Sequence, residues 1–161
     1  MAMDTQQIGI IGRQILIANL LAADLEVAVP IRDRGIDLIV YRDRAKDQGF
    51  KACPIQLKTA SKAVFGLDKK YEHFRNLRIV FVWNANEPSK AQLFALDYGE
   101  AEAILGEMKY AQSRSWEKGK YTTTRPSADL KSILERFEVK NPQQWPQRLG
   151  MIDPVVASTL P

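Results

Sequence analysis

The sequence predicts an α/β fold in which a mixed central sheet is flanked by helices. Near the N-terminus, apolar residues recur at helical spacing, and two short strand patterns then follow each other across a polar turn. The other observations are a continuous apolar run close to residue 80 and helical patterns after residue 98. Helices before and after a run of strands cover both faces of such a sheet. A chain of 161 residues can bury one hydrophobic core, so we expect a single domain over residues 1–137.

The first expected element is a helix over residues 4–23. Asp4 or Thr5 has the hydrogen-bonding side chain that favours a helix start. The apolar residues at helical spacing, which we expect to form the buried stripe, are Ile8, Ile11, Ile15, Ala18 and Ala22. Further apolar residues widen this stripe, so we expect burial around much of the helix circumference; they are Ile10, Leu16, Ile17, Leu20 and Leu21.

Three strands are expected next, and the last two should form a hairpin. Residues 25–29 are a short β pattern that Pro30 ends, and residues 36–41 are the second strand. Only a polar turn separates that strand from the third, residues 51–59, so antiparallel pairing is expected. Pro54 has no backbone N–H to donate and should therefore lie at a strand start or at a sheet edge.

The remainder of the chain supplies the rest of the sheet and the later helices. Residues 77–83 are apolar except for Arg78 and continuous from Ile79, which is typical of a strand covered on both faces. Residues 91–96 and 115–124 predict extended segments, and residues 98–108 predict a helix. Ser127 caps a last helix that ends near Phe137, and its apolar face consists of Leu130, Ile133, Leu134 and Phe137. Four of the eight prolines follow residue 138, so residues 138–161 are expected to form an extended tail.

Composition narrows the classes of protein that fit. The formal net charge is +4 and the isoelectric point is about 9.2, an excess of positive charge that permits a nucleic-acid partner. Cys53 is the only cysteine, so no internal disulfide is possible. The sequence has no apolar run of about 18 residues and no basic region ahead of an apolar stretch at its start. We therefore expect a cytoplasmic protein with no membrane-spanning helix.

Three polar residues occur where the predicted hairpin should be apolar. Asp37 interrupts its strand, and because an unpaired buried carboxylate is costly, it needs a partner, solvent or a metal. Gln56 and Lys58 are two residues apart on the next strand, so their side chains point to the same face. An acid, an amide and an amine on one face can hold a divalent metal through oxygen atoms while the amine acts on a water molecule. This combination suits the metal-assisted hydrolysis of a phosphodiester.

The two segments that carry these residues resemble the active-site motif of the PD-(D/E)xK nuclease superfamily. They are Gly35-Ile36-Asp37-Leu38-Ile39-Val40 and Ile55-Gln56-Leu57-Lys58-Thr59-Ala60. The helix around Gly12 is similar to the first core helix of that superfamily, and the resemblance covers about residues 8–97. Most members have Asp or Glu where this chain has Gln56, and the chain is similar to the subgroup with Gln at that position.

The resemblance implies a restriction-endonuclease-like fold and a metal-dependent DNA endonuclease. Asp37, Gln56 and Lys58 would be the catalytic residues. Asp37, the Gln56 side-chain oxygen and the Leu57 carbonyl would hold Mg²⁺ or Mn²⁺. Lys58 would stabilise the attacking hydroxide or the negative charge on the phosphorane. A homodimer would be the simplest way to cut both strands of DNA.

The chain differs from many active members on the first helix, where those proteins carry a further Glu. Here Arg13 and Gln14 follow Gly12, and no Asp or Glu lies between Asp4 and Asp24. A site with one formal negative charge holds Mg²⁺ weakly. The alternative function is therefore a catalytically inactive module on the same fold, which binds nucleic acid or docks on a protein through its tail.

A plainer interpretation of the site and a different fold also remain open. Asp37 can be a strand-end residue that hydrogen-bonds the Gly35 backbone. The alternative fold is another mixed α/β sandwich, in which Asp37, Gln56 and Lys58 never converge.

Basic residues around the motif are candidates for contacts with nucleic-acid phosphates. The expected nucleic-acid-binding residues are Arg32, Arg34, Lys62, Lys69 and Lys70. Phe65, Tyr71 and Phe74 are interleaved with the lysines, and aromatic side chains in such a segment can stack on bases. The alternative is an ordinary solvated face whose aromatic side chains turn into the core.

Overall fold

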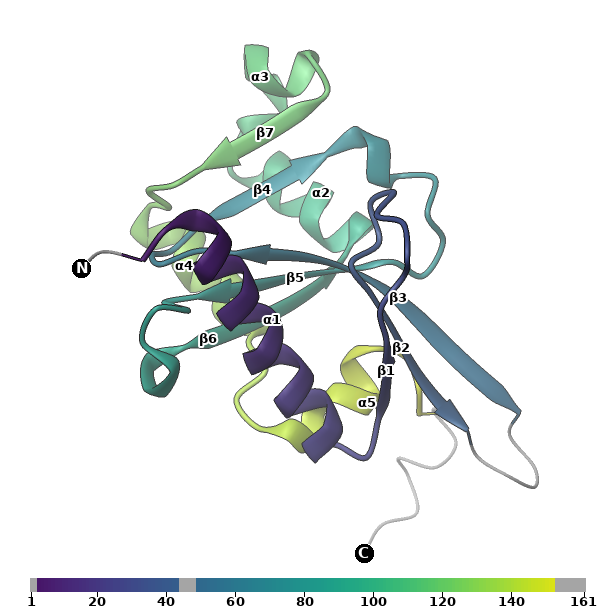
Figure 1. Ribbon diagram of the computed structural model, residues 1–161. Helices are drawn as coiled ribbons and strands as arrows, with labels where there is room; N and C mark the ends of the chain where they lie inside the picture. The colour runs from purple at the N-terminus through teal and green to yellow at the C-terminus, as the bar shows by residue number, and fades with distance from the viewer. Residues whose placement is uncertain (1–2, 44–48, 153–161) are drawn as a thin grey trace, which may run out of the picture.

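A computed structural model describes residues 3–43 and 49–152 of the chain (Figure 1). The elements, with η denoting a short 3-10 helix, are α1 (Thr5–Ala22), β1 (Glu26–Ala28), β2 (Leu38–Asp43), β3 (Phe50–Thr59), β4 (Phe65–Asp68), η1 (Lys69–Tyr71), β5 (Arg78–Trp83), η2 (Pro88–Lys90), β6 (Gln92–Asp97), α2 (Tyr98–Glu107), η3 (Tyr110–Gln112), α3 (Arg114–Glu117), β7 (Lys120–Thr123), α4 (Ala128–Leu134), η4 (Glu135–Phe137), η5 (Pro142–Gln144) and α5 (Trp145–Arg148). A five-stranded mixed sheet lies between helices, which confirms the expected α/β class.

The first helix, α1, begins where the sequence predicts. Asp4 is its N-cap: the Asp4 side chain accepts a hydrogen bond from the Gln7 backbone, and the Gln7 side chain accepts one from the Asp4 backbone. This reciprocal pair satisfies two backbone N–H groups that a helix start leaves without partners. Of the helices in the described part of the chain, none is long and apolar enough to cross a membrane.

The buried face of α1 differs from the predicted stripe. Gly12, Leu16 and Leu20 are its buried residues, whereas Ala18 and Ala22 of the predicted stripe are exposed. Ile10 and Leu21 are 62% and 53% exposed, so the expected burial around much of the helix is wrong. The reason is that α1 packs on the sheet with one face, and the small residue Gly12 sets which face can approach the strands closely.

The five-stranded sheet has the order β1-β2-β3-β5-β6. Its first three strands are antiparallel neighbours, and the β2–β3 register pairs Leu38 with Ile55, which confirms the expected hairpin. After β3 the chain leaves the sheet, forms β4 and η1, and returns as β5 parallel to β3 (Figure 1). β6 then pairs antiparallel with β5.

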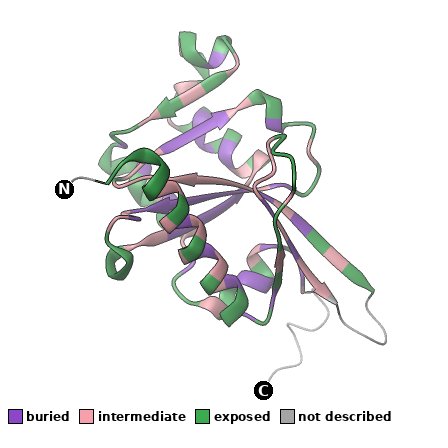
Figure 2. Cartoon of the chain, in the orientation of Figure 1, coloured by how far each residue is buried: buried purple, intermediate pink, exposed green. Residues whose placement is uncertain are grey.

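β5 is buried on both faces, as its continuous apolar sequence predicts. Val80 and Val82 belong to a core cluster with residues of α1 and α5. Ile79, Phe81 and Trp83 belong to a second cluster with residues of α2, α4 and β4. Figure 2 shows the buried strand between its partly exposed covering elements. The central sheet therefore separates two apolar cores.

Pro54 lies inside β3 rather than at its start. It pairs with Ile39 of β2, whereas the parallel pairing with β5 begins only at Ile55. At Pro54 the strand therefore has β2 on one side only, which agrees with the expected position at a sheet edge.

Two segments differ from the sequence-based expectation and form the second sheet. Residues 61–77, where sequence patterns predict no regular element, contain β4 and η1. Residues 115–124 contain β7 but begin within the short helix α3. β4 and β7 pair antiparallel, with Phe65 opposite Thr123. Local sequence does not reveal such a pairing, because the strand partners are far apart along the chain.

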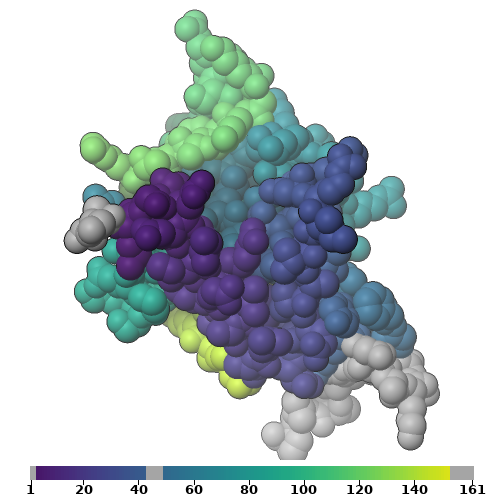
Figure 3. All heavy atoms as spheres, viewed as in Figure 1, coloured from purple at the N-terminus to yellow at the C-terminus, as the bar shows by residue number. Residues whose placement is uncertain are grey.

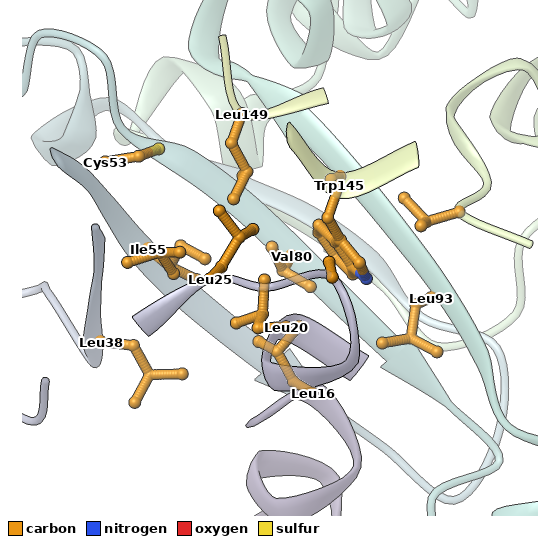
Figure 4. Close-up of a cluster of buried hydrophobic side chains, with 14 of the residues drawn as sticks. Leu16, Leu20, Leu25, Leu38, Cys53, Ile55, Val80, Leu93, Trp145 and Leu149 are labelled. Atoms are coloured by element: carbon orange, nitrogen blue, oxygen red, sulfur yellow. The ribbon is translucent and has the colours of Figure 1, made fainter. Parts of the chain in front are cut away.

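The segment after residue 138 is folded rather than extended up to Ile152. It contains η5 and α5, and the side chain of Trp145 is fully buried. Figure 4 shows Trp145 and Leu149 on the same core as Leu16 and Val80. Its prolines lie in the first turns of η5 and α5, where a missing N–H costs nothing. Residues 153–161 of the expected tail lie outside the described residues.

Candidate functional site

Asp37 lies directly before β2, where its backbone N–H donates to the Ile55 carbonyl at 2.8 Å. Its side chain is 12% exposed. Oδ2 of Asp37 accepts a hydrogen bond from the Leu57 backbone N–H and another from Gln56 Nε2, both at 2.7 Å. The Gln56 amide also donates to the Leu57 carbonyl at 3.2 Å. The structure thus brings Asp37, Gln56 and Leu57 together, as the sequence predicts.

The hydrogen bond to the Gly35 backbone is made by a different aspartate. Asp33 Oδ1 accepts it at 2.9 Å, within the turn before β2. The plainer interpretation of Asp37 as the partner of Gly35 is therefore wrong. Because Asp33 accepts the hydrogen bond from the Gly35 N–H, the Asp37 carboxylate is available to bind β3 and so to join it to β2.

Arg13 is the residue of this site that sequence reasoning did not assign. Its Nη2 atom lies 3.9 Å from Asp37 Oδ1, and its side chain is 41% exposed. The pair is a long, partly solvated contact, so it holds the guanidinium only weakly. A signal existed in the sequence, because Arg13 is the only charged residue between Asp4 and Asp24.

A pocket of about 460 Å³ opens beside Asp37 and the first turns of α1. In the described part of the chain, Asp37 and Arg13 are the charged residues that line it. The lining residues are Thr5, Gln6, Gly9, Ile10, Arg13, Asp37, Leu57 and Thr59. Figure 3 shows the surface hollowed between the N-terminal half of α1, β7 and the segment before β2. A ligand in this hollow can reach Oδ1, the carboxylate oxygen not bound by Leu57 and Gln56.

Burial raises the pKa of the Asp37 carboxyl, and the nearby Asp33 adds to the rise. The hydrogen bond from the Leu57 backbone lowers this pKa, as do the positive charges of Arg13 and Lys58. The ionised carboxylate is therefore less well solvated than a surface aspartate. Such a group gains more than an exposed one from a cation at its unoccupied oxygen.

Lys58 is two residues beyond Gln56 on β3 and is partly buried. Its Nζ lies 5.7 Å from the centre of the Tyr71 ring. Burial lowers the pKa of the Lys58 ammonium, and the charges of Lys120 and Lys70 lower it further. The negative charges of Asp68 and Asp37 raise this pKa.

The lowered pKa of Lys58 predicts a pH-dependent cost to stability. The unfolded chain holds this proton more tightly than the folded chain, so the cost is fully present below the folded-state pKa of Lys58 and disappears as the pH rises from there past the unfolded-state pKa. Replacing Lys58 with Met should leave the free energy of unfolding at pH 7 unchanged or raise it by up to about 2 kcal/mol. The difference in free energy of unfolding between Lys58→Met and wild type should shrink as the pH approaches 10. Urea unfolding of both proteins at pH 7 and pH 9.5 measures this difference.

Lys131→Met is the matched control for this experiment, because Lys131 is exposed on α4. It should change stability little at either pH. A Lys58→Met variant that is strongly destabilised at pH 7 would contradict the prediction.

The other basic residues predicted to bind nucleic acid do not form one cluster. Arg34 and Lys70 line a common pocket of about 380 Å³ with Tyr71. Lys62 lines a separate pocket of about 470 Å³ with Arg125. In addition, Arg32 is exposed in the segment before β2, and Lys69 lies 4.9 Å from the centre of the Trp116 ring.

The aromatic residues of the same segment turn inward rather than toward a ligand. Phe65 is fully buried and Tyr71 is 5% exposed, and both belong to the second core cluster. Phe74 is half-buried against this cluster. These three rings therefore do not form an exposed stacking surface. The alternative of a solvated basic face with aromatic side chains in the core describes this segment better.

The metal ligands expected from the sequence are only partly in place at Asp37. In the part of the chain that the structure describes, no group of three His, Cys, Asp or Glu side chains could hold a metal. Gln56 turns its Nε2 atom, not the predicted side-chain oxygen, toward Asp37 Oδ2 and the Leu57 carbonyl, so Asp37 Oδ1 is the one charged oxygen left for a cation. Mg²⁺ binds proteins through one or two carboxylates together with substrate phosphates. A cation at Asp37 would therefore need a further anion, such as a phosphate.

No family model, curated protein or solved structure matches this chain. Functional inference therefore rests on the mixed sheet and on the polar site at the β2–β3 hairpin.

Proposed function

We propose that this protein is a metal-dependent DNA endonuclease of the PD-(D/E)xK type with a restriction-endonuclease-like fold. The observation that carries the proposal is the pair of hydrogen bonds that Asp37 accepts from Leu57 and Gln56. They join the acid of one motif segment to the amide and backbone of the other, at the edge of a pocket. The positive charge of Lys58 lowers the pKa of the same carboxyl.

In this proposal each residue has a distinct role in the hydrolysis of a phosphodiester. Asp37 and Leu57 would hold Mg²⁺ or Mn²⁺, joined by Gln56 once its amide turns its oxygen toward the site, and the bound ion would supply the positive charge that activates water. Lys58 would offset the negative charge that develops on the phosphate oxygens. Its partly buried position strengthens that interaction, because a low-dielectric environment screens charge less than water does.

The proposed partner is DNA, bound across the hollow beside α1. Arg34 and Lys70 would contact the phosphate backbone on the side of the segment before β2. The exposed side chains of Arg32, Lys62 and Lys69 would add contacts farther out. Cleavage of both strands would require two sites, which a homodimer supplies. A cytoplasmic location belongs to the same proposal.

The second candidate function is nucleic-acid binding without cleavage, and the position of Arg13 favours it. A guanidinium 3.9 Å from Asp37 Oδ1 competes with a metal ion for the carboxylate. The same guanidinium can bind a phosphate through two parallel hydrogen bonds. This candidate predicts binding that needs no metal and weakens steeply with salt.

Plasmid cleavage tests the leading proposal. With Mg²⁺ or Mn²⁺, the wild-type protein should nick supercoiled plasmid, and a chelator should stop the reaction. Asp37→Asn removes the charged ligand and should lower the rate by at least about 100-fold, as expected when transition-state charge loses its stabilisation. Gel electrophoresis over time gives both rates.

Asp33→Asn is the matched control, because it removes the same charge from the turn before β2 and keeps an oxygen for the Gly35 N–H. It should cut at close to the wild-type rate. Equal cutting by Asp37→Asn and wild type would show that the site is elsewhere. Salt-sensitive binding without cutting by wild type, in either metal, would favour the second candidate.

A further inference from the structure

The two oxygens of the Asp37 carboxylate have different environments. Oδ2 is bound by the Leu57 N–H and by the Gln56 amide, so it is fixed in place. Oδ1 is turned toward the Arg13 guanidinium. A metal at this site would need Oδ1, because Oδ2 already accepts two hydrogen bonds. Arg13 therefore faces the one carboxylate oxygen that a cation can use.

Arg13 is placed so that it can exchange this carboxylate for another anion. Its contact with Asp37 is long, at 3.9 Å, and its side chain is 41% exposed whereas that of Asp37 is 12% exposed. The guanidinium thus lies on the solvent side of the pair and lines the pocket. A phosphate entering the pocket offers it two oxygens at once, which is a stronger interaction than a single long ion pair.

We propose that Arg13 couples the binding of a phosphodiester to the binding of a divalent cation at Asp37. In the free protein, Arg13 neutralises the carboxylate and repels the cation. When a nucleic-acid phosphate binds, Arg13 turns to it and Oδ1 becomes available, while the phosphate adds the second negative charge that the site lacks. This inference rests on the proposed function, because it takes the ligand to be a nucleic-acid backbone.

The coupling must be reciprocal, since a ligand that tightens cation binding is itself bound more tightly when the cation is present. Couplings of this kind change affinity by about 5- to 150-fold. The free protein should therefore hold a divalent cation poorly, and the complex with nucleic acid should hold it well. A metal titration of the free protein alone would therefore underestimate the affinity that the site has for the cation when nucleic acid is bound.

Binding of Mn²⁺, followed by electron paramagnetic resonance of the free ion, tests the coupling without measuring activity. The probe ligand is a short phosphorothioate duplex, which keeps the backbone charge and resists hydrolysis. With wild-type protein, saturating duplex should raise the Mn²⁺ affinity by about tenfold. Arg13→Gln should bind Mn²⁺ more tightly than wild type without duplex, and duplex should then raise its affinity by a smaller factor than in wild type, because only the charge of the phosphate remains to act. Arg13→Lys, which keeps the charge, should stay close to wild type without duplex.

Two controls make the result specific. Asp37→Asn with duplex measures the Mn²⁺ that the nucleic acid binds by itself. Arg136→Gln removes an arginine of equal charge that lies 3.6 Å from an exposed carboxylate, Glu107, and it should not change Mn²⁺ affinity. If Arg136→Gln raises the Mn²⁺ affinity as much as Arg13→Gln does, net charge alone explains the effect and the proposal is overturned.

The proposal is also overturned if Arg13→Gln binds Mn²⁺ no more tightly than wild type without duplex, or if no Mn²⁺ binding is measurable in that variant. Undiminished enhancement by duplex in Arg13→Gln would overturn it as well. These outcomes differ from failure of the proposed function, in which wild type neither cuts nor binds DNA at low salt. The comparison of free wild type with free Arg13→Gln decides the role of Arg13 in either case.

Discussion

Replacing Trp145 with Ala is expected to lower the free energy of unfolding by about 3–5 kcal/mol. Trp145 is fully buried and belongs to the core cluster that joins α1, the sheet and α5. Removing the indole would leave a large cavity between Leu16 and Leu93, which lie around it in Figure 4. A loss of this size is a large share of the stability of an ordinary domain. Urea unfolding followed by circular dichroism measures it.

Trp145→Phe is the matched control, because it keeps an aromatic ring in the same place. The Nε1 atom of Trp145 is buried and has no hydrogen-bond partner among the described residues. Losing this N–H should therefore cost little, so Phe should destabilise far less than Ala. If Ala is tolerated as well as Phe, the segment around α5 is not part of the folded core.

Gly12→Ala is expected to destabilise the protein by about 1–3 kcal/mol and to weaken any activity at Asp37. A Cβ atom at Gly12 would lie 2.6 Å from Thr59 Oγ1 and 2.9 Å from Thr59 Cβ, so α1 and β3 would have to separate. Arg13 is the next residue on α1, so its contact with Asp37 would shift as the helix moves. Thermal unfolding and the plasmid assay together report both effects.

Gly9→Ala is the control within the same helix. A Cβ atom at Gly9 meets nothing within 4 Å. Alanine there should stabilise the helix by about 0.5–1 kcal/mol, because it restricts the unfolded chain more than glycine does. If Gly9→Ala stabilises the protein and Gly12→Ala destabilises it, Gly12 is the position at which α1 contacts β3. Stabilisation by both would show that α1 does not lie against Thr59.

The elements with strong local patterns could be predicted from the sequence. The start of α1 follows from the capping side chain of Asp4, and β5 follows from its continuous apolar run. The β2–β3 hairpin follows from two strand patterns across a short polar turn. In each case neighbouring residues along the chain carry the information.

The elements that depend on distant partners could not be predicted in the same way. β4 becomes a strand by pairing with β7, and α5 is held by Trp145, which packs into a core formed by much earlier segments. The buried face of α1 depends on the fit of Gly12 against Thr59, whereas periodicity alone selects the most apolar stripe. Prolines after residue 138 indicated an extended tail, but the two in the described part of that segment, Pro142 and Pro146, occupy helix starts.

The same distinction applies to the candidate site. The contacts of Asp37 with Gln56 and Leu57 follow from the register of one hairpin, so the motif could predict them. Arg13 comes from α1, and its distance to Asp37 depends on how that helix lies across β3. The sequence showed that the first helix has no carboxylate near Gly12, whereas the structure shows that Arg13 of this helix lies 3.9 Å from Asp37.

The packing of α5 beneath α1 has a consequence for how this chain folds. Leu16 and Leu20 share their core with Trp145 and Leu149, which are separated from them by most of the chain. Contacts between such distant segments form slowly, because a long loop must close before they can stabilise anything. During synthesis, the sheet strands can cover part of the apolar face of α1, but the part that packs against Trp145 and Leu149 would stay uncovered until these residues emerge. Apolar surface exposed in this way favours aggregation and chaperone binding.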